Sequence, residues 1–157
     1  MKRSYLFSVI LTILIGCTSV PYAPEIPKGW RHLNVGPFAI SIPPTWNYDA
    51  PNRQEDSFVG QIMGPNLELS FDCSDMGYAN HLISADDANF KNYNIKIDTT
   101  DKYIVKTIWP KATGNGTTGI YINSRTSTFN FQMNGHNLSV QNENLALKAF
   151  KTITFKQ

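Results

Sequence analysis

The stretch FVGQIMGPNLELSFD, from Phe58 to Asp72, predicts the element around which the fold is built. Its second half alternates between apolar and polar side chains from Leu67 onward, a period of two that is typical of a half-buried strand. Its first half, Phe58–Met63, is another apolar segment. Gly64-Pro65-Asn66 stands between the two halves and is a turn signal. We therefore expect a hairpin of two antiparallel strands here.

Further strands are expected along the rest of the chain. In Phe38–Ile42 the apolar residues take alternate positions. The Asn134-Gly135 pair predicts another hairpin, because a tight two-residue turn needs positive φ at both central positions and these residues tolerate it. That hairpin would join Thr126–Met133 to Asn137–Val140. Three more strands are expected at Tyr93–Asp98, Tyr103–Trp109 and Gly119–Asn123.

One helix is expected near the carboxyl end of the chain. Asn142 or Asn144 would cap its first turn. A second, short helix is expected between Ser84, as its N-cap, and Asn92. The apolar stripe of the first helix, at positions i, i+3, i+4 and i+7, consists of Ala146, Ala149, Phe150 and Ile153. The alternative for Ile153 is a terminal strand, Thr152–Phe155, in which Ile153 and Phe155 alternate. The sum is an α+β domain, a single antiparallel β-sheet of about six to eight strands flanked by one or two helices.

The amino-terminal residues are typical of a secretory signal peptide. Lys2 and Arg3 form a basic start, and Tyr5–Ile15 is apolar apart from Ser8 and Thr12. This apolar run is shorter than the about 20 residues that a helix needs to cross a bilayer. It fits the hydrophobic region of a signal peptide instead. We therefore expect residues 1–16 to be removed from the mature protein.

The segment ends in Leu14-Ile15-Gly16-Cys17, which resembles the lipobox of bacterial lipoproteins. The resemblance implies that Cys17 is acylated on its sulfur and, after cleavage, on its new amino group. Two or more acyl chains hold a protein stably at membrane lipid. No aspartate follows Cys17 directly, which in Gram-negative lipoproteins favours the outer membrane, facing the periplasm. The alternative is an ordinary signal peptide with an incidental cysteine.

The mature chain divides into a tether and one domain. Residues 17–29 carry prolines at a spacing of three, which favours a short, stiff, extended tether. Residues 30–157 are long enough for a single domain with a sizeable core. Of the 14 Lys and Arg residues, Lys2 and Arg3 leave with the signal peptide, so 12 basic residues face 12 acidic ones. This even balance offers no basic field for nucleic acid, and we expect no such partner.

Two segments of the domain resemble PsbP-like domains. FAISIPPTW (Phe38–Trp46) resembles their opening strand, and ALKAFKTITF (Ala146–Phe155) resembles their final helix and last strand. The blocks DSFVG, LELSFD and MGYANHL resemble recurring segments of uncharacterised bacterial secreted proteins. The PsbP-like resemblance implies an α/β/α sandwich, in which helices flank an antiparallel sheet. It implies no shared chemistry, because members of the family are largely accessory or binding proteins.

Reactive residue types gather in SFDCSDMGYANH, from Ser70 to His81. Asp72, Cys73, Asp75 and His81 are all of types that bind zinc. Structural zinc motifs bring paired cysteines or histidines at short fixed spacing, and this cluster has one of each. We therefore expect neither a metal site nor a cofactor here.

Cys73 as a catalytic nucleophile is a second interpretation, with His81 or His136 as its base. A nucleophilic cysteine needs a cationic neighbour or a helix N-terminus that lowers its pKa. The two aspartates beside Cys73 would raise that pKa instead. With Cys17 acylated, Cys73 also lacks a partner for a disulfide within the chain.

The third interpretation of this segment is a contact loop. Asp72, Asp75, Tyr78 and His81 would meet a protein partner in the cell envelope, since exposed aromatic residues are typical of interfaces. We therefore expect a membrane-anchored lipoprotein with a non-enzymatic binding or accessory domain. One version is an immunity-type protein that neutralises a toxin delivered by a competitor. The alternative is a hydrolase or a metal-dependent enzyme that uses the Asp72–His81 cluster.

Overall fold

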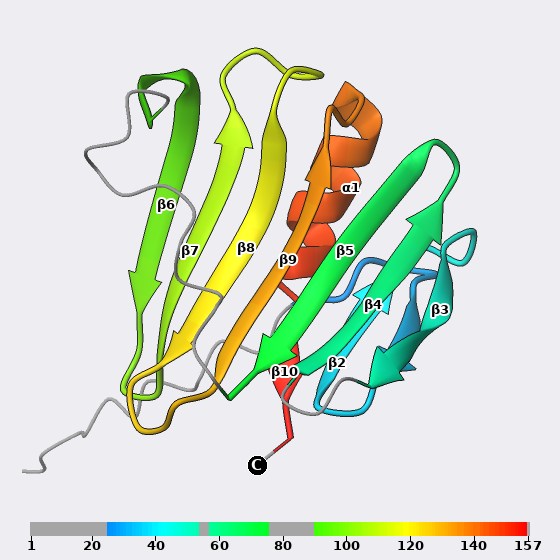
Figure 1. Ribbon diagram of the computed structural model, residues 1–157. Coiled ribbons are helices and arrows are strands. Elements are labelled where there is room, and N and C mark those ends of the chain that lie inside the picture. Colours follow the sequence, from blue (N-terminus) through cyan, green and yellow to red (C-terminus); the bar gives the residue numbers. More distant parts are fainter. Residues whose placement is uncertain (1–24, 54–56, 76–89, 157) are drawn as a thin grey trace, which may run out of the picture.

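The computed structural model describes residues 25–53, 57–75 and 90–156. A seven-stranded antiparallel sheet forms the centre of the molecule (Figure 1), with strand order β3-β4-β5-β9-β8-β7-β6. The strands, in chain order, are β3 (Asn47–Arg53), β4 (Ser57–Gly64), β5 (Leu67–Ser74), β6 (Tyr93–Thr99), β7 (Tyr103–Pro110), β8 (Thr117–Ser124) and β9 (Asn130–His136). Because β9 inserts between β5 and β8, the strands on either side of residues 76–89 lie in different halves of the sheet.

A second layer covers one face of this large sheet. It consists of a three-stranded sheet, in the order β1 (Arg31–Asn34), β2 (Phe38–Ile42), β10 (Thr154–Phe155), and of the helix α1 (Val140–Phe150). Figure 1 shows α1 and β2 behind the large sheet. The Thr152 hydroxyl, just after α1, accepts a hydrogen bond from the Ser41 amide at 2.8 Å and so ties the helix to β2.

The hydrophobic core lies between these two layers. On β5 the residues Leu67, Leu69, Phe71 and Cys73 are buried, while Glu68 and Ser70 between them are exposed. Phe38 on β2 places its ring 5.0 Å from Phe71 and 4.9 Å from Phe131 on β9, both edge-on. The side chains that close the core from the helix are Ala146, Ala149 and Phe150. The apolar faces of the strands and the apolar stripe of α1 therefore pack together in one hydrophobic core.

The α+β class and the large antiparallel sheet are confirmed. The hairpin of β4 and β5 is confirmed as well, with Gly64 opposite Leu67 and only Pro65 and Asn66 in the turn. Pro65 suits the first turn position because its φ is fixed, and Asn66 takes the positive φ of 55° that the second position requires. The three strands expected between Tyr93 and Asn123 are all present as β6, β7 and β8.

The structure differs from the expectation of a single sheet. Phe38–Ile42 pairs with β1 and β10 and belongs to the smaller sheet. Four of its five residues are buried, because β2 is the central strand of the small sheet and packs into the core beneath the large sheet. A local alternation cannot distinguish these two positions, since it records which face of a strand is buried but not which strands lie beside it.

The prediction of a hairpin turn at Asn134-Gly135 is wrong. Both residues lie inside β9, and Gly135 pairs with Thr118 on β8. A Cβ on Gly135 would stand 2.8 Å from the backbone oxygen of Glu68 and from the Leu69 side chain, so the glycine serves a close approach of strands rather than a turn. The segment Asn137–Val140 is not a strand, because the chain turns at Asn137, with φ of 51°, and enters α1.

The helix begins earlier than expected. Ser139 is its N-cap, and the Ser139 hydroxyl accepts a hydrogen bond from the Asn142 amide. Asn142 is not a cap: its side-chain amide donates to the backbone oxygens of Pro65 and Asn66 and holds α1 against the β4–β5 turn. Ile153 lies beyond the helix. Of the second expected helix, residues 84–89 lie outside the described residues, and Phe90–Asn92 form one 3₁₀ turn, η2.

Candidate functional site

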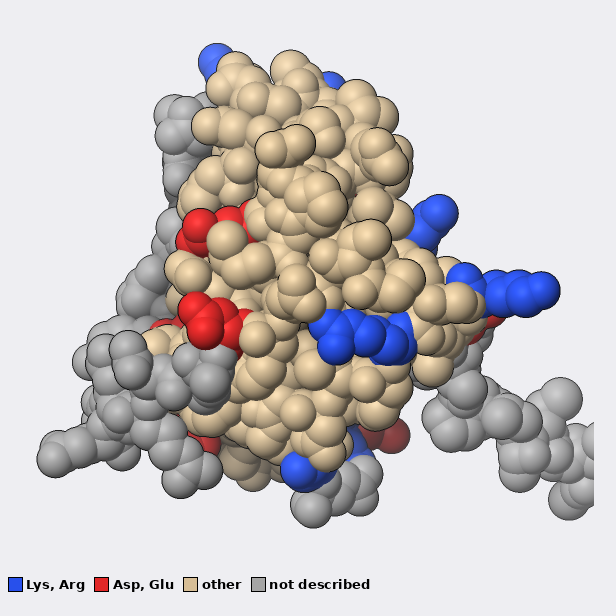
Figure 2. Space-filling model, turned by 90° about the vertical axis from the view of Figure 1, so that its right-hand side faces the viewer, with Lys and Arg blue, Asp and Glu red and all other residues tan. Residues whose placement is uncertain are grey.

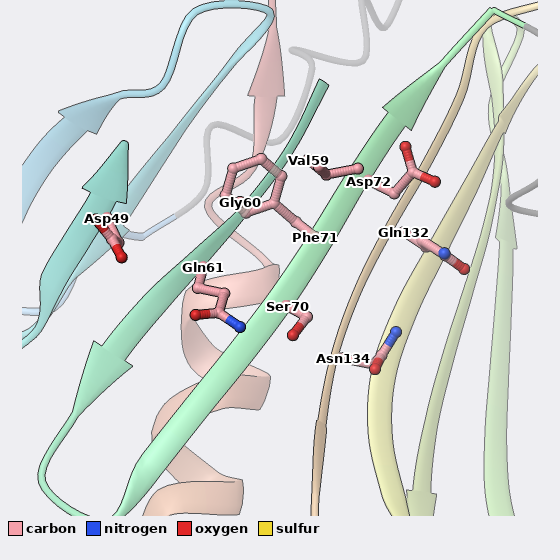
Figure 3. Close-up of a pocket in the computed structure, with 9 residues that line it drawn as sticks. All are labelled: Asp49, Val59, Gly60, Gln61, Ser70, Phe71, Asp72, Gln132 and Asn134. Carbon is pink, nitrogen blue, oxygen red and sulfur yellow. The ribbon is translucent and has the colours of Figure 1, made fainter. Parts of the chain in front are cut away.

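The face of the large sheet opposite α1 is polar where β3, β4, β5 and β9 meet. It contains a hollow of about 530 Å³. Figure 3 shows its polar side chains on one side of these four strands, with α1 behind them. The lining residues are Asp49, Val59, Gly60, Gln61, Ser70, Phe71, Asp72, Gln132 and Asn134. Six of the nine lining residues therefore have a carboxylate, an amide or a hydroxyl in the side chain.

The sheet register arranges these side chains in two parallel rows across the strands. In one row Asp49 stands opposite Gln61, Gln61 opposite Ser70, and Ser70 opposite Asn134. In the other, Val59 stands opposite Asp72 and Asp72 opposite Gln132. Directly opposite residues of antiparallel strands have Cβ atoms about 4.5–5.5 Å apart. Apart from Val59, the two rows thus form a polar floor of the hollow.

Some of these side chains are held in place and others are available. The Gln61 amide donates to the Glu68 carboxylate at 2.6 Å, and the Ser70 hydroxyl lies 3.5 Å from the same oxygen. Within the part of the chain that the structure describes, the side chains of Asp49, Gln132 and Asn134 make no hydrogen bond with another residue. These three groups can bind a ligand without breaking a contact of the fold.

Asp72 connects the hollow with the loop expected from the sequence. It lies near the end of β5 and is partly buried in the hollow's lining. Asp75 follows at a bend just after β5 and is exposed. Tyr78 and His81 lie outside the described residues. The structure thus brings one member of the expected contact loop, Asp72, together with polar side chains of three other strands.

Cys73 points away from the hollow, into the core. It is 5 % exposed and pairs with Phe131 of β9. Burial, followed by the charges of Asp72 and Asp75, raises the pKa of Cys73 to about 12. His136 lies five residues along β9 from Phe131, about 17 Å at the rise of a strand, and on the opposite face. The structure therefore does not bring Cys73 and His136 together.

Tyr121 on β8 is the neighbour of the lining residue Gln132 across the strands and was not expected there. It stands opposite Gln132, and it is 1 % exposed. Its hydroxyl makes no hydrogen bond with any described residue. Burial, and then the neighbouring Tyr93, raises the pKa of Tyr121 to about 12, so the hydroxyl stays a neutral donor near pH 7.

Asp49, Gln61, Ser70, Gln132 and Asn134 were also missed from the sequence. Period two does place Ser70 on the same face as Asp72, and Gln132 on the same face as Asn134. It does not reveal that β9 lies beside β5, because more than fifty residues separate them in the chain and no local signal records the pairing.

Two further observations on the described residues concern the requirements of a metal site and of a membrane-spanning helix. Among the described residues there is no group of three or more His, Cys, Asp or Glu side chains placed to hold a metal ion. No helix in this part of the chain is long and apolar enough to cross a membrane. Figure 2, which faces the β3 side of the molecule, shows mostly uncharged surface there, with acidic and basic side chains in small separate groups.

Comparison with known proteins adds no family to these observations. No protein-family model matches the chain, and no curated protein matches it at a significant level.

Proposed function

We propose that the protein is a lipid-anchored, non-enzymatic binding protein of the bacterial cell envelope. Acylated Cys17 holds it at membrane lipid, in the outer membrane and facing the periplasm. Its domain binds a partner through the polar hollow and the loop that continues from it, which contains Asp75, Tyr78 and His81. The observation that carries the binding half of this proposal is the position of Asp72, which lines the hollow near the end of β5, three residues before Asp75.

The side-chain chemistry of the hollow supports binding over catalysis. Amides and hydroxyls both donate and accept hydrogen bonds, and they recognise a polar surface without forming covalent bonds. Asp49 and Asp72 add negative charge, so the hollow favours neutral or cationic groups of a partner. Burial of Cys73 and its raised pKa argue against a thiolate nucleophile at the end of β5.

The rival function is a hydrolase or a metal-dependent enzyme that uses the Asp72–His81 cluster. Metal analysis of the purified protein separates the two functions. Stoichiometric zinc or another transition metal that Asp75→Asn and His81→Ala remove would contradict the binding proposal and support the enzyme.

The anchor is tested by Cys17→Ser. We expect this variant to accumulate as an unprocessed precursor that takes up no labelled palmitate, while the wild-type chain is processed and labelled. Fractionation of the envelope then shows whether the wild-type protein is in the inner or the outer membrane. Normal processing and labelling of Cys17→Ser would exclude the lipoprotein.

The hollow is tested with a photoreactive amino acid in living cells. Placed at residue 132 it reaches whatever occupies the hollow, and we expect a discrete adduct after irradiation. The matched control is the same amino acid at Val140, which is 64 % exposed on α1, on the other side of the sheet. Asn134→Phe, which fills the hollow, should abolish the adduct at residue 132. An absent adduct, or equal adducts from both positions, would refute binding at the hollow.

A further inference from the structure

The strand β6 ends the large sheet and leaves one side of its backbone without a neighbouring strand among the described residues. Its pairing with β7 is regular from Tyr93 to Thr99. The hydrogen bonds at the two ends of this ladder run from the Lys111 amide to the Asn92 oxygen and from the Thr100 amide to the Tyr103 oxygen. In an antiparallel pair such bonded positions alternate. The even-numbered residues of β6 therefore bond to β7.

The odd-numbered residues of β6 consequently direct their N–H and C=O groups outward. Pro110, which has no N–H, stands opposite Tyr93, as this alternation requires. Ile95, Ile97 and Thr99 thus present three sets of backbone donors and acceptors along the edge. Ile97 is 60 % exposed, and its side chain lies on the face of the large sheet opposite α1, here called the open face. Unprotected edges of this kind are templates for another strand.

The opposite edge of the sheet is protected. The pairing of β3 with β4 shifts register between Asp49 and Asn52, and Pro51 lies inside the irregular segment. A bulge and a proline both interrupt a ladder and discourage a further strand. Of the two edges of this sheet, β6 is the regular one.

The charges of β6 are complementary to those of a second, antiparallel copy of β6. Lys96 and Asp98 lie on the same face, are 61 % and 53 % exposed, and form an ion pair at 2.7 Å. If Ile97 stands opposite Ile97 of the second copy, Lys96 stands opposite Asp98 and Asp98 opposite Lys96. Ile95 then stands opposite Thr99, so all outward backbone groups of these residues meet their complements.

The neighbouring registers are unfavourable. Because only odd-numbered residues face outward, the strand can shift only in steps that keep these residues opposite one another. The step to one side places Lys96 opposite Lys96, and the step to the other side places Asp98 opposite Asp98. Like charges directly opposite each other destabilise a strand pair. Charge and backbone alternation therefore select the same register.

We propose that β6 is a homodimer interface, through which two copies of this chain join their large sheets edge to edge about a two-fold axis at Ile97. The partner is a second copy of this chain, and the contact is isologous. Both open faces then lie on the same side of one continuous sheet. Ile97 of each copy packs beside its counterpart, and Ile104, 41 % exposed on β7, extends this apolar contact. The dimer does not depend on what the hollow binds.

The experiment uses two differently tagged full-length copies co-expressed in bacteria. Their co-capture from membranes solubilised in mild detergent measures the association. We expect the wild-type copies to associate and Lys96→Asp or Asp98→Lys to weaken self-association about tenfold, because each reversal creates two like-charge contacts per dimer. The exchanged double variant, Lys96→Asp with Asp98→Lys, should restore association to the wild-type level.

Two controls separate the interface from folding. Both charged residues are exposed, so each single variant should keep the wild-type melting temperature. Ile97→Pro removes an outward N–H but none of the bonds to β7, and it should also abolish co-capture, while Ile97→Thr, which keeps the N–H, should weaken it less. Wild-type copies that do not associate, or charge reversals that leave co-capture unchanged, would overturn the proposed dimer.

Discussion

The two faces of the large sheet differ sharply although they belong to the same strands. On β5, Leu69 and Phe71 are buried against the second layer, while Ser70 and Asp72 line the hollow on the other face. On β9, Phe131 is fully buried and Gln132 lies beside the hollow. One face is held by apolar packing against β2 and α1, and the other carries the amides and carboxylates that line the hollow on β3, β4, β5 and β9. The covered face therefore carries the stability of the domain and leaves the open face available for recognition.

This difference between the two faces predicts that substitutions at adjacent residues of β9 lower the free energy of unfolding by unequal amounts. Phe131→Ala should lower the free energy of unfolding by about 3–5 kcal/mol, because it removes a fully buried ring that contacts Phe38 and Phe155. Gln132→Ala, one position along the same strand, should change it by less than about 0.5 kcal/mol. Urea unfolding of both variants checks this difference. Similar losses for the two variants would mean that the open face is also structural.

A smaller effect is expected at a polar contact within the covered side. The Thr118 hydroxyl donates to the buried Glu143 carboxylate at 3.1 Å, while Thr113 donates to its other oxygen at 3.2 Å. Thr118→Val removes a donor from a buried carboxylate and should cost about 1–3 kcal/mol. Thr117→Val is the matched control, since Thr117 lies on the open face and bonds the exposed His136. If both variants melt at the same temperature, α1 does not depend on this contact.

The smallest predicted effect is a pH dependence of the covered face. The pKa of Cys73 is raised from its ordinary value near 9 to about 12. Well below pH 9 the Cys73 thiol is protonated in both the folded and the unfolded state, so its titration does not lower the free energy of unfolding. As pH rises from about 9 toward 12, the unfolded chain loses this proton and the folded chain keeps it, so stability falls.

Comparison with Cys73→Ala isolates this contribution. Between pH 8 and pH 10 the wild-type protein should lose about 1 kcal/mol more unfolding free energy than the variant. Tyr121, whose pKa is raised as well, is present in both proteins and cancels. Equal pH slopes would place Cys73 in a more solvated position than the core of β5.

Much of the fold was predictable because its signals are local. The hairpin of β4 and β5 follows from alternation on both sides of Pro65 and Asn66. The strands β6, β7 and β8 follow from the same period. The Asn-Gly pair at 134–135 misled because a glycine that permits a turn also permits a close approach between strands, and only the neighbouring Glu68 backbone reveals which is needed.

The candidate site was only partly predictable. Asp72 was singled out from the sequence and lies in the lining of the hollow, and the expected packing of Cys73 agrees with its burial. The Asp49, Gln132 and Asn134 side chains that complete the hollow come from β3 and β9, whose places beside β4 and β5 result from long-range pairing.

By itself, the sequence determined which residues form most strands and the helix, and which face of β5 is apolar. It determined this because side-chain periodicity and turn chemistry act over a few residues. Only the tertiary structure decided that β2 lies in a separate small sheet and that β9 lies between β5 and β8. It also decided that β6 ends the large sheet, with outward backbone groups that no described strand pairs. These outcomes depend on which apolar faces cover one another, and that competition involves the whole chain.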